Sequence, residues 1–208
     1  ADHWKVYLVT MLISFVSVVP FIIYAEVKRR MKRVFVLCVA LLLIAEIVLW
    51  GSGTWFWELV LGVQIFFIAF NLMEALLPSL ISKESPAGYK GTAMGIYSTS
   101  QFIGVAIGGA LGGWVDGMFD SQTVFLAGAL LTTLWLLVAS TMKEPPYVSS
   151  LRIALPEGVL ADDTLKTRLL AKEGVSEVLV VAEEQSAYVK IDSKVTNRFE
   201  IEQAVKEA

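Results

Sequence analysis

A row of polar side chains marks one long apolar stretch of this sequence. Gln64, Phe67, Asn71, Glu74 and Pro78 are spaced three, four, three and four residues apart, which places them within about 80° of one helix face. A charged group inside a bilayer costs at least ~2.5 kcal/mol and therefore faces protein or water. We expect this row, the polar stripe, to face inward, with Glu74 taking up and releasing a proton. The open alternative is that Glu74 hydrogen-bonds neighbouring backbone and never titrates.

A second set of polar groups lies on the next apolar stretch. Met94, Tyr97 and Gln101 share a helix face, and they offer a thioether, a hydroxyl and an amide. Together with Gln64 and Asn71, such groups suit the lining of a path for a small molecule that is partly polar and partly apolar. It is equally open that they contact only neighbouring helices.

The segments that position these residues are long enough to cross a membrane. The chain has 208 residues, of which 56% are hydrophobic and 18% charged, whereas soluble domains average about 25% charged residues. A bilayer-spanning helix needs about 20 apolar residues. The sequence predicts five spans, at residues 4–25, 34–50, 55–81, 91–119 and 121–142.

The loops predict the orientation of the spans. Residues 28–33 and 82–90 together hold seven Lys or Arg residues, whereas residues 51–54 and 120–122 hold none. Cytoplasmic loops are enriched in Lys and Arg. The two basic loops and everything after residue 142 are therefore expected in the cytoplasm, with the spans in a bacterial inner membrane.

Glycines are unusually dense in the fourth span. Gly104, Gly108 and Gly112 form one row along the helix, and Gly109, Gly113 and Gly117 form a second row beside it. Helices in a bilayer associate by close packing at small residues. The two rows predict a helix wedged between two close neighbours; the alternative is a helix that is merely flexible.

Other function classes find little support in the residues. Cys38 is the single cysteine and His3 the single histidine, so we expect neither a disulfide within the chain nor a cysteine metal cluster. The net charge of −3 gives no indication of nucleic-acid binding. We expect no enzyme activity, no metal and no cofactor beyond a proton gradient.

The segment MEALLPSLISKESPAGYKGTAMGIYSTSQFIGVAIGGALGGW (73–114) resembles helices ten and eleven of the major facilitator superfamily, in its drug–proton antiporter branch. The basic run after the first span resembles the loop between helices eight and nine. The resemblance implies half of that fold, helices eight to twelve, with the N-terminal half of the same transporter as a partner. It also implies that Gly91 and Thr92, at the inner end of helix eleven, meet an acidic residue of that half.

The last third of the chain reads as a small α+β domain. Residues 1–142 form the predicted helical part, residues 143–149 a linker, and residues 150–208 a β-α-β-β-α domain. The domain resembles the ferredoxin-like, heavy-metal-associated domain, and its presence makes the transporter resemblance closest to the YajR-type subgroup. The loop at 156–163 lacks the two metal-binding cysteines of that domain, so no metal is expected. Its sheet edge could pair with a second copy; the alternative is a solvated appendage.

Together these features predict the C-terminal part of a secondary active transporter. We expect proton-coupled antiport or efflux of a small molecule by alternating access, in contact with membrane lipid. The alternative is a membrane scaffold that does not transport and whose C-terminal domain is an interaction or regulatory module. The sequence names neither the substrate nor the direction of exchange.

Overall fold

The computed structural model describes residues 3–52, 55–156 and 159–206. Residues 1–2, 53–54, 157–158 and 207–208, which fall inside the two predicted domains, lie outside the described residues. The chain forms two compact units. One comprises Ala1–Leu80 and Ser98–Pro145, and the other comprises Ile81–Tyr97 and Pro146–Ala208. The connection between the third and fourth long helices thus groups with the C-terminal domain. The predicted domains, divided only at residues 143–149, place this connection in the helical part instead.

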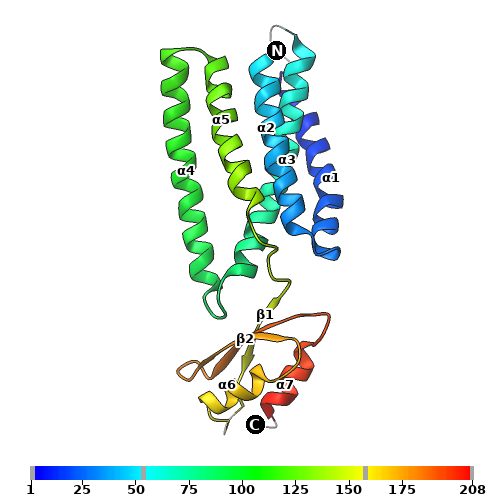
Figure 1. Cartoon of the computed structure of the whole chain (residues 1–208), viewed down its shortest axis with the longest axis vertical. Coiled ribbons are helices and arrows are strands. Elements are labelled where there is room, and N and C mark those ends of the chain that lie inside the picture. The colour runs from blue at the N-terminus through cyan, green and yellow to red at the C-terminus, as the bar shows by residue number, and fades with distance from the viewer. Residues whose placement is uncertain (1–2, 53–54, 157–158, 207–208) are drawn as a thin grey trace. The chain divides into compact units, whose positions relative to one another are not determined.

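Five long helices occupy the predicted spans, and the predicted class of transmembrane helices with a small α+β tail is confirmed (Figure 1). A helix that is apolar all round is stable only in a core or in lipid. In keeping with a lipid-facing surface, large apolar side chains such as Phe15, Phe102 and Leu131 remain about 70% exposed. The helices are α1 (His3–Val27), α2 (Met31–Gly51), α3 (Phe56–Glu84), α4 (Lys90–Met118) and α5 (Ser121–Ser140).

Four of these helices are both long and apolar enough to cross a membrane, namely α1 from Tyr7 onward, α2, α3 and α5. The helix at the fourth predicted span, α4, is 29 residues long but does not reach the same apolarity among the described residues. Its glycines, hydroxyl side chains and Gln101 lower its mean hydropathy. The span expected at residues 91–119 is therefore less apolar than the other four.

The best-packed pair of long helices is α2 and α5, which lie side by side in Figure 1. The ring of Phe35 meets the ring of Trp135 edge-on, with 6.1 Å between their centroids. Small residues let the two backbones approach: Cys38 and Ala45 on α2 are fully buried, and Ala129 on α5 is 8% exposed.

The C-terminal domain is a three-stranded antiparallel sheet with strand order β1-β3-β2. Its two helices, α6 and α7, lie together against the sheet in Figure 1. The core between them contains Ile153, Val189, Leu169 and Ile201. The elements are β1 (Ser149–Ala154), α6 (Asp163–Leu170), β2 (Val175–Val181), β3 (Ser186–Ile191) and α7 (Arg198–Lys206).

Side-chain caps fix the starts of both small helices. The Asp162 carboxylate accepts a hydrogen bond from the Leu165 backbone N–H at 2.9 Å, and this bond holds the pKa of Asp162 below its usual range. The side-chain Oδ1 atom of Asn197 accepts a hydrogen bond from the Glu200 backbone N–H at 3.1 Å. Each cap satisfies an amide that has no partner within its own helix.

Candidate functional site

Two of the predicted pathway residues meet across α3 and α4. The Gln101 Nε2 atom donates a hydrogen bond to Oε1 of Glu74 at 2.6 Å. A side-chain amide carries both a donor and an acceptor. It can therefore donate to a carboxylate, as here, and its oxygen can accept from the same acid once that acid is protonated. Gln101 thus suits an acid that changes its protonation state.

The outer end of the polar stripe has a different partner. The Gln64 Nε2 atom donates to the Ser14 Oγ atom at 2.8 Å and to the Thr10 carbonyl oxygen at 3.3 Å, so Gln64 joins α3 to α1. Ser14 is fully buried, and its hydroxyl donates to the Thr10 carbonyl oxygen at 2.7 Å. In this structure Gln64 holds two helices together. Its predicted place on a substrate path stays a prediction.

Asn71 lies on the polar stripe between Gln64 and Glu74. Its Nδ2 atom is buried and has no hydrogen-bond partner within residues 3–52, 55–156 and 159–206. A buried donor without a partner costs about 1–3 kcal/mol. The described helices therefore offer no acceptor to the side-chain amide of Asn71.

The other two predicted lining residues belong to the second unit. Met94 and Tyr97 are half-buried on α4, within Ile81–Tyr97. Their predicted role in lining a path stays a prediction. Gly91 and Thr92, at the start of the same helix, are exposed, and a Cβ atom added to Gly91 would have nothing of the described chain within 4 Å.

The glycine rows of α4 do not pack against close neighbours here. A Cβ atom at Gly104, Gly108, Gly109 or Gly113 would meet no described atom within 4 Å, and one at Gly112 would meet only Val124, at 3.9 Å. The described part of α4 contains no buried residue. The described helices of this chain therefore do not supply the two expected neighbours, and the close packing of the glycine rows stays a prediction. Close packing needs a second backbone near each row, and neither row has one.

Glu46, a half-buried acid on α2, lies against α5. A Cβ atom added to Gly128 on α5 would overlap the carboxyl group of Glu46, so this carboxyl group lies directly against the α5 backbone. Glu46 is not among the site residues that the sequence predicted. The signal available was the position of a lone acid within an apolar helix, but nothing in the sequence linked it to Gly128, 82 residues further along the chain.

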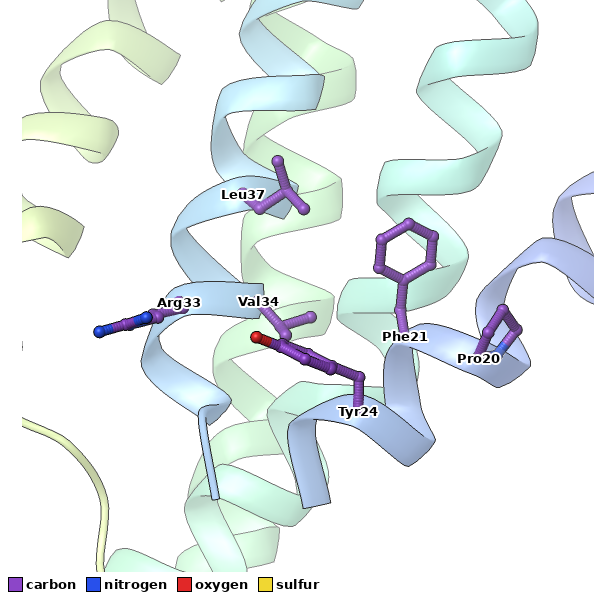
Figure 2. Close-up of a pocket in the computed structure, with 6 residues that line it drawn as sticks. All are labelled: Pro20, Phe21, Tyr24, Arg33, Val34 and Leu37. Carbon is purple, nitrogen blue, oxygen red and sulfur yellow. The ribbon is translucent and has the colours of Figure 1, made fainter. Parts of the chain in front are cut away.

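A groove of about 400 Å³ lies between the inner ends of α1 and α2. In Figure 2 the Phe21 and Tyr24 side chains of α1 extend beside α2, while the Arg33 side chain points away from Phe21. The groove contains none of the predicted pathway residues, so it is not the expected substrate path. Its lining residues are Pro20, Phe21, Tyr24, Arg33, Val34 and Leu37.

No group of three or more His, Cys, Asp or Glu side chains that could hold a metal ion occurs in the described part of the chain. Cys38 is a free thiol buried in α2.

Comparison with known proteins points to a transporter. A family model described as the YajR YAM domain matches residues 151–207. The chain is 75% identical to the inner membrane transport protein YajR of Escherichia coli (strain K12), over all of this chain and 46% of that protein. It is 40% identical over 107 residues to an uncharacterized transporter of Buchnera aphidicola subsp. Acyrthosiphon pisum, covering 51% of this chain and 27% of that protein.

A more distant similarity is to the probable galactarate/D-glucarate transporter GudP of Bacillus subtilis (strain 168). It is 29% identical over 90 residues, covering 40% of this chain and 20% of that protein. These relatives are named as transporters and not as enzymes. The chain spans about half the length of the first of them and less of the others. The similarity of the tail to a heavy-metal-associated domain stays a prediction.

Proposed function

We propose that this chain is the C-terminal half of a secondary transporter of the major facilitator type. It would exchange a small molecule for protons across a bacterial inner membrane, with its C-terminal domain in the cytoplasm. The observation that carries the proposal is the 2.6 Å hydrogen bond that joins Glu74 of α3 to Gln101 of α4. The name of the 75% identical relative supports inner-membrane transport; the coupling to protons rests on Glu74.

The mechanism follows from the cost of charge in a membrane. Two bundles of a secondary transporter rock about a midplane site, so that it opens to each side in turn. A carboxylate in that region is stable only when it faces water or a partner. Proton uptake by Glu74 removes the charge and lets the surrounding helices close, and Gln101 has a hydrogen bond to offer in either state.

The open surfaces of the chain support a partner half. Both glycine rows of α4 lack a close neighbour, and the buried Asn71 amide lacks a hydrogen-bond partner among the described residues. An N-terminal half would supply helices against these faces. The exposed first turn of α4, with Gly91 and Thr92, would then receive an acidic side chain, because a helix N-terminus favours a negative charge.

The test is a proton-flux assay on the full-length protein. Inside-out vesicles acidified by respiration are mixed with a panel of small organic solutes, and a pH-sensitive dye reports proton release in exchange for a substrate. Glu74→Gln should abolish the exchange. Glu58→Gln is the matched control, because Glu58 is an exposed acid in the first turn of the same helix.

The same assay separates the transporter from the scaffold interpretation. If Glu74→Gln exchanges protons as well as the parent protein, and only deletion of residues 147–208 abolishes activity, the proton role of Glu74 is refuted. The function would then lie in the C-terminal domain.

A further inference from the structure

The C-terminal domain has a second sheet face, which lies opposite its own core. Side chains on a strand alternate between the two faces. Since Ala187, Val189 and Ile191 of β3 belong to the core, Tyr188 and Lys190 point to the other face. The strand register places Leu179 beside Tyr188 and Glu177 beside Lys190. We call these four residues the sheet patch: Glu177, Leu179, Tyr188 and Lys190.

Lys190 of the sheet patch binds the end of a membrane helix. Its side chain is only 7% exposed, and its Nζ atom lies 3.5 Å from a carboxylate oxygen of Glu177. The same Nζ atom donates a hydrogen bond to the Lys83 carbonyl oxygen at 3.0 Å. Lys83 lies in the last turn of α3, where the carbonyl groups lack partners within the helix and the helix dipole is negative. A cation from the C-terminal domain therefore caps the helix that carries Glu74.

Gly88, in the connection after α3, makes a second contact with the patch. Its φ of +80° lies in the region that favours glycine. A Cβ atom there would come within 2.5 Å of the Leu179 side chain and 3.6 Å of the Tyr188 ring. Two neighbours, Ser85 and Ala87, are 5% and 3% exposed. One side of the connection thus packs on the sheet, while Pro86 and Tyr89 remain exposed.

The linker into the domain touches the same helix end. The Lys83 Nζ atom lies 5.1 Å from the centre of the Tyr147 ring, within the range of a cation–π contact. The end of α3 is therefore held from two sides, by β3 through its carbonyl group and by the linker through its side chain.

We propose that the C-terminal domain is a latch on the α3–α4 connection and thereby regulates transport. The connection joins the two helices that share the hydrogen bond between Glu74 and Gln101. Movement of these helices during alternating access requires their connection to yield or to move with the domain. Release of the sheet patch from residues 83–88 frees the connection and changes the transport rate. The regulatory part of this inference rests on the proposed function; the latch contact does not.

The latch contact is tested by the accessibility of residue 87. Full-length protein carrying Cys38→Ala and Ala87→Cys is purified in detergent and reacted with a maleimide, and labelling should be slow because position 87 is buried. Lys190→Met keeps the apolar stem but removes the donor, and it should raise the labelling rate about tenfold or more, as expected for loss of a hydrogen bond from a charged group. Lys166→Met, at an exposed lysine on α6, should leave the rate unchanged.

A separate measurement shows that the domain itself stays folded. Hydrogen exchange at the Leu165 amide of α6 should be the same in the parent and in Lys190→Met. An unchanged labelling rate at residue 87 would overturn the latch. So would faster labelling accompanied by rapid exchange at Leu165, because the domain would then simply have unfolded.

The regulatory role is tested by proton exchange in vesicles with Lys190→Met and Lys166→Met. A several-fold change for the Lys190 variant alone supports the latch as a regulator. Faster maleimide labelling of residue 87 with an unchanged rate of proton exchange in vesicles overturns that role. Failure of the proposed function is seen separately, as normal proton exchange in Glu74→Gln.

Discussion

Glu74 and Gln101 are 27 residues apart in the sequence and share a 2.6 Å hydrogen bond between α3 and α4. Glu74 is exposed within this chain and Gln101 is half-buried, so the pair lies at an edge of the described helices. In the proposed full-length transporter the second half would cover this edge.

Glu74 and Gln101 should be energetically coupled. Residues in direct contact show coupling free energies of roughly 0.5–3 kcal/mol in double-mutant cycles. We expect Glu74→Ala and Gln101→Ala to be non-additive in the thermal stability of the purified full-length protein. The control cycle pairs Glu74→Ala with Gln122→Ala, an exposed amide in the first turn of α5, and should be additive. Additivity in both cycles would show that the hydrogen bond contributes nothing.

The contact between α1 and α3 should contribute measurably to stability. Ser14→Ala removes the main acceptor of the Gln64 amide and should lower the free energy of unfolding by about 0.6–2 kcal/mol, the range for polar contacts between membrane helices. Ser17→Ala is the control, because the Ser17 hydroxyl donates only to Ile13 of its own helix. Adding Gln64→Leu to Ser14→Ala should recover much of the loss, since both partners are then apolar. A further loss in the double variant would contradict this account.

Glycine at position 128 should matter because of Glu46. A side chain at 128 overlaps the Glu46 carboxyl group, so Gly128→Val should separate α2 from α5 and lower the melting temperature of the purified protein. In a Glu46→Ala background the same change should be much less harmful, because the space is vacant. Equal losses in both backgrounds would show that helix propensity at 128, and not this contact, sets the cost.

The stability of α6 should fall in acid. Hydrogen bonds to its charged form, first from the Leu165 N–H, lower the pKa of Asp162. The stabilisation is therefore fully present above the unfolded-state pKa of about 3.9 and is lost as the pH falls through the lower folded-state value. Exchange of the Leu165 amide, corrected for the intrinsic rate, should accelerate in that window.

At neutral pH, Asp162→Ala should produce the same acceleration and should remove the acid dependence. Asp163→Asn keeps the Asp162 cap and should behave like the parent protein. If hydrogen exchange at Leu165 in Asp162→Ala still accelerates in acid as in the parent protein, a group other than Asp162 is responsible for the acid dependence.

Local sequence patterns were enough to predict the elements. Apolar runs of about 20 residues predicted five long helices, and the β-α-β-β-α pattern at residues 150–208 predicted the small domain. These features depend on neighbours within one or two turns, or on the bilayer itself. For the same reason, the phase of the polar stripe on α3 could be calculated from spacing alone.

Contacts between distant segments were settled only by the tertiary structure. The stripe residues share one face, yet Gln64 binds α1 and Glu74 binds α4. The glycine rows showed where a backbone could approach, but they carried no information on whether one does. Lys190 reads as an ordinary strand lysine until the fold places it at the end of α3. Spacing fixes the direction of a side chain relative to its own helix or strand, whereas its partner depends on how separate elements pack, and in this chain the partners lie 27 to 107 residues away.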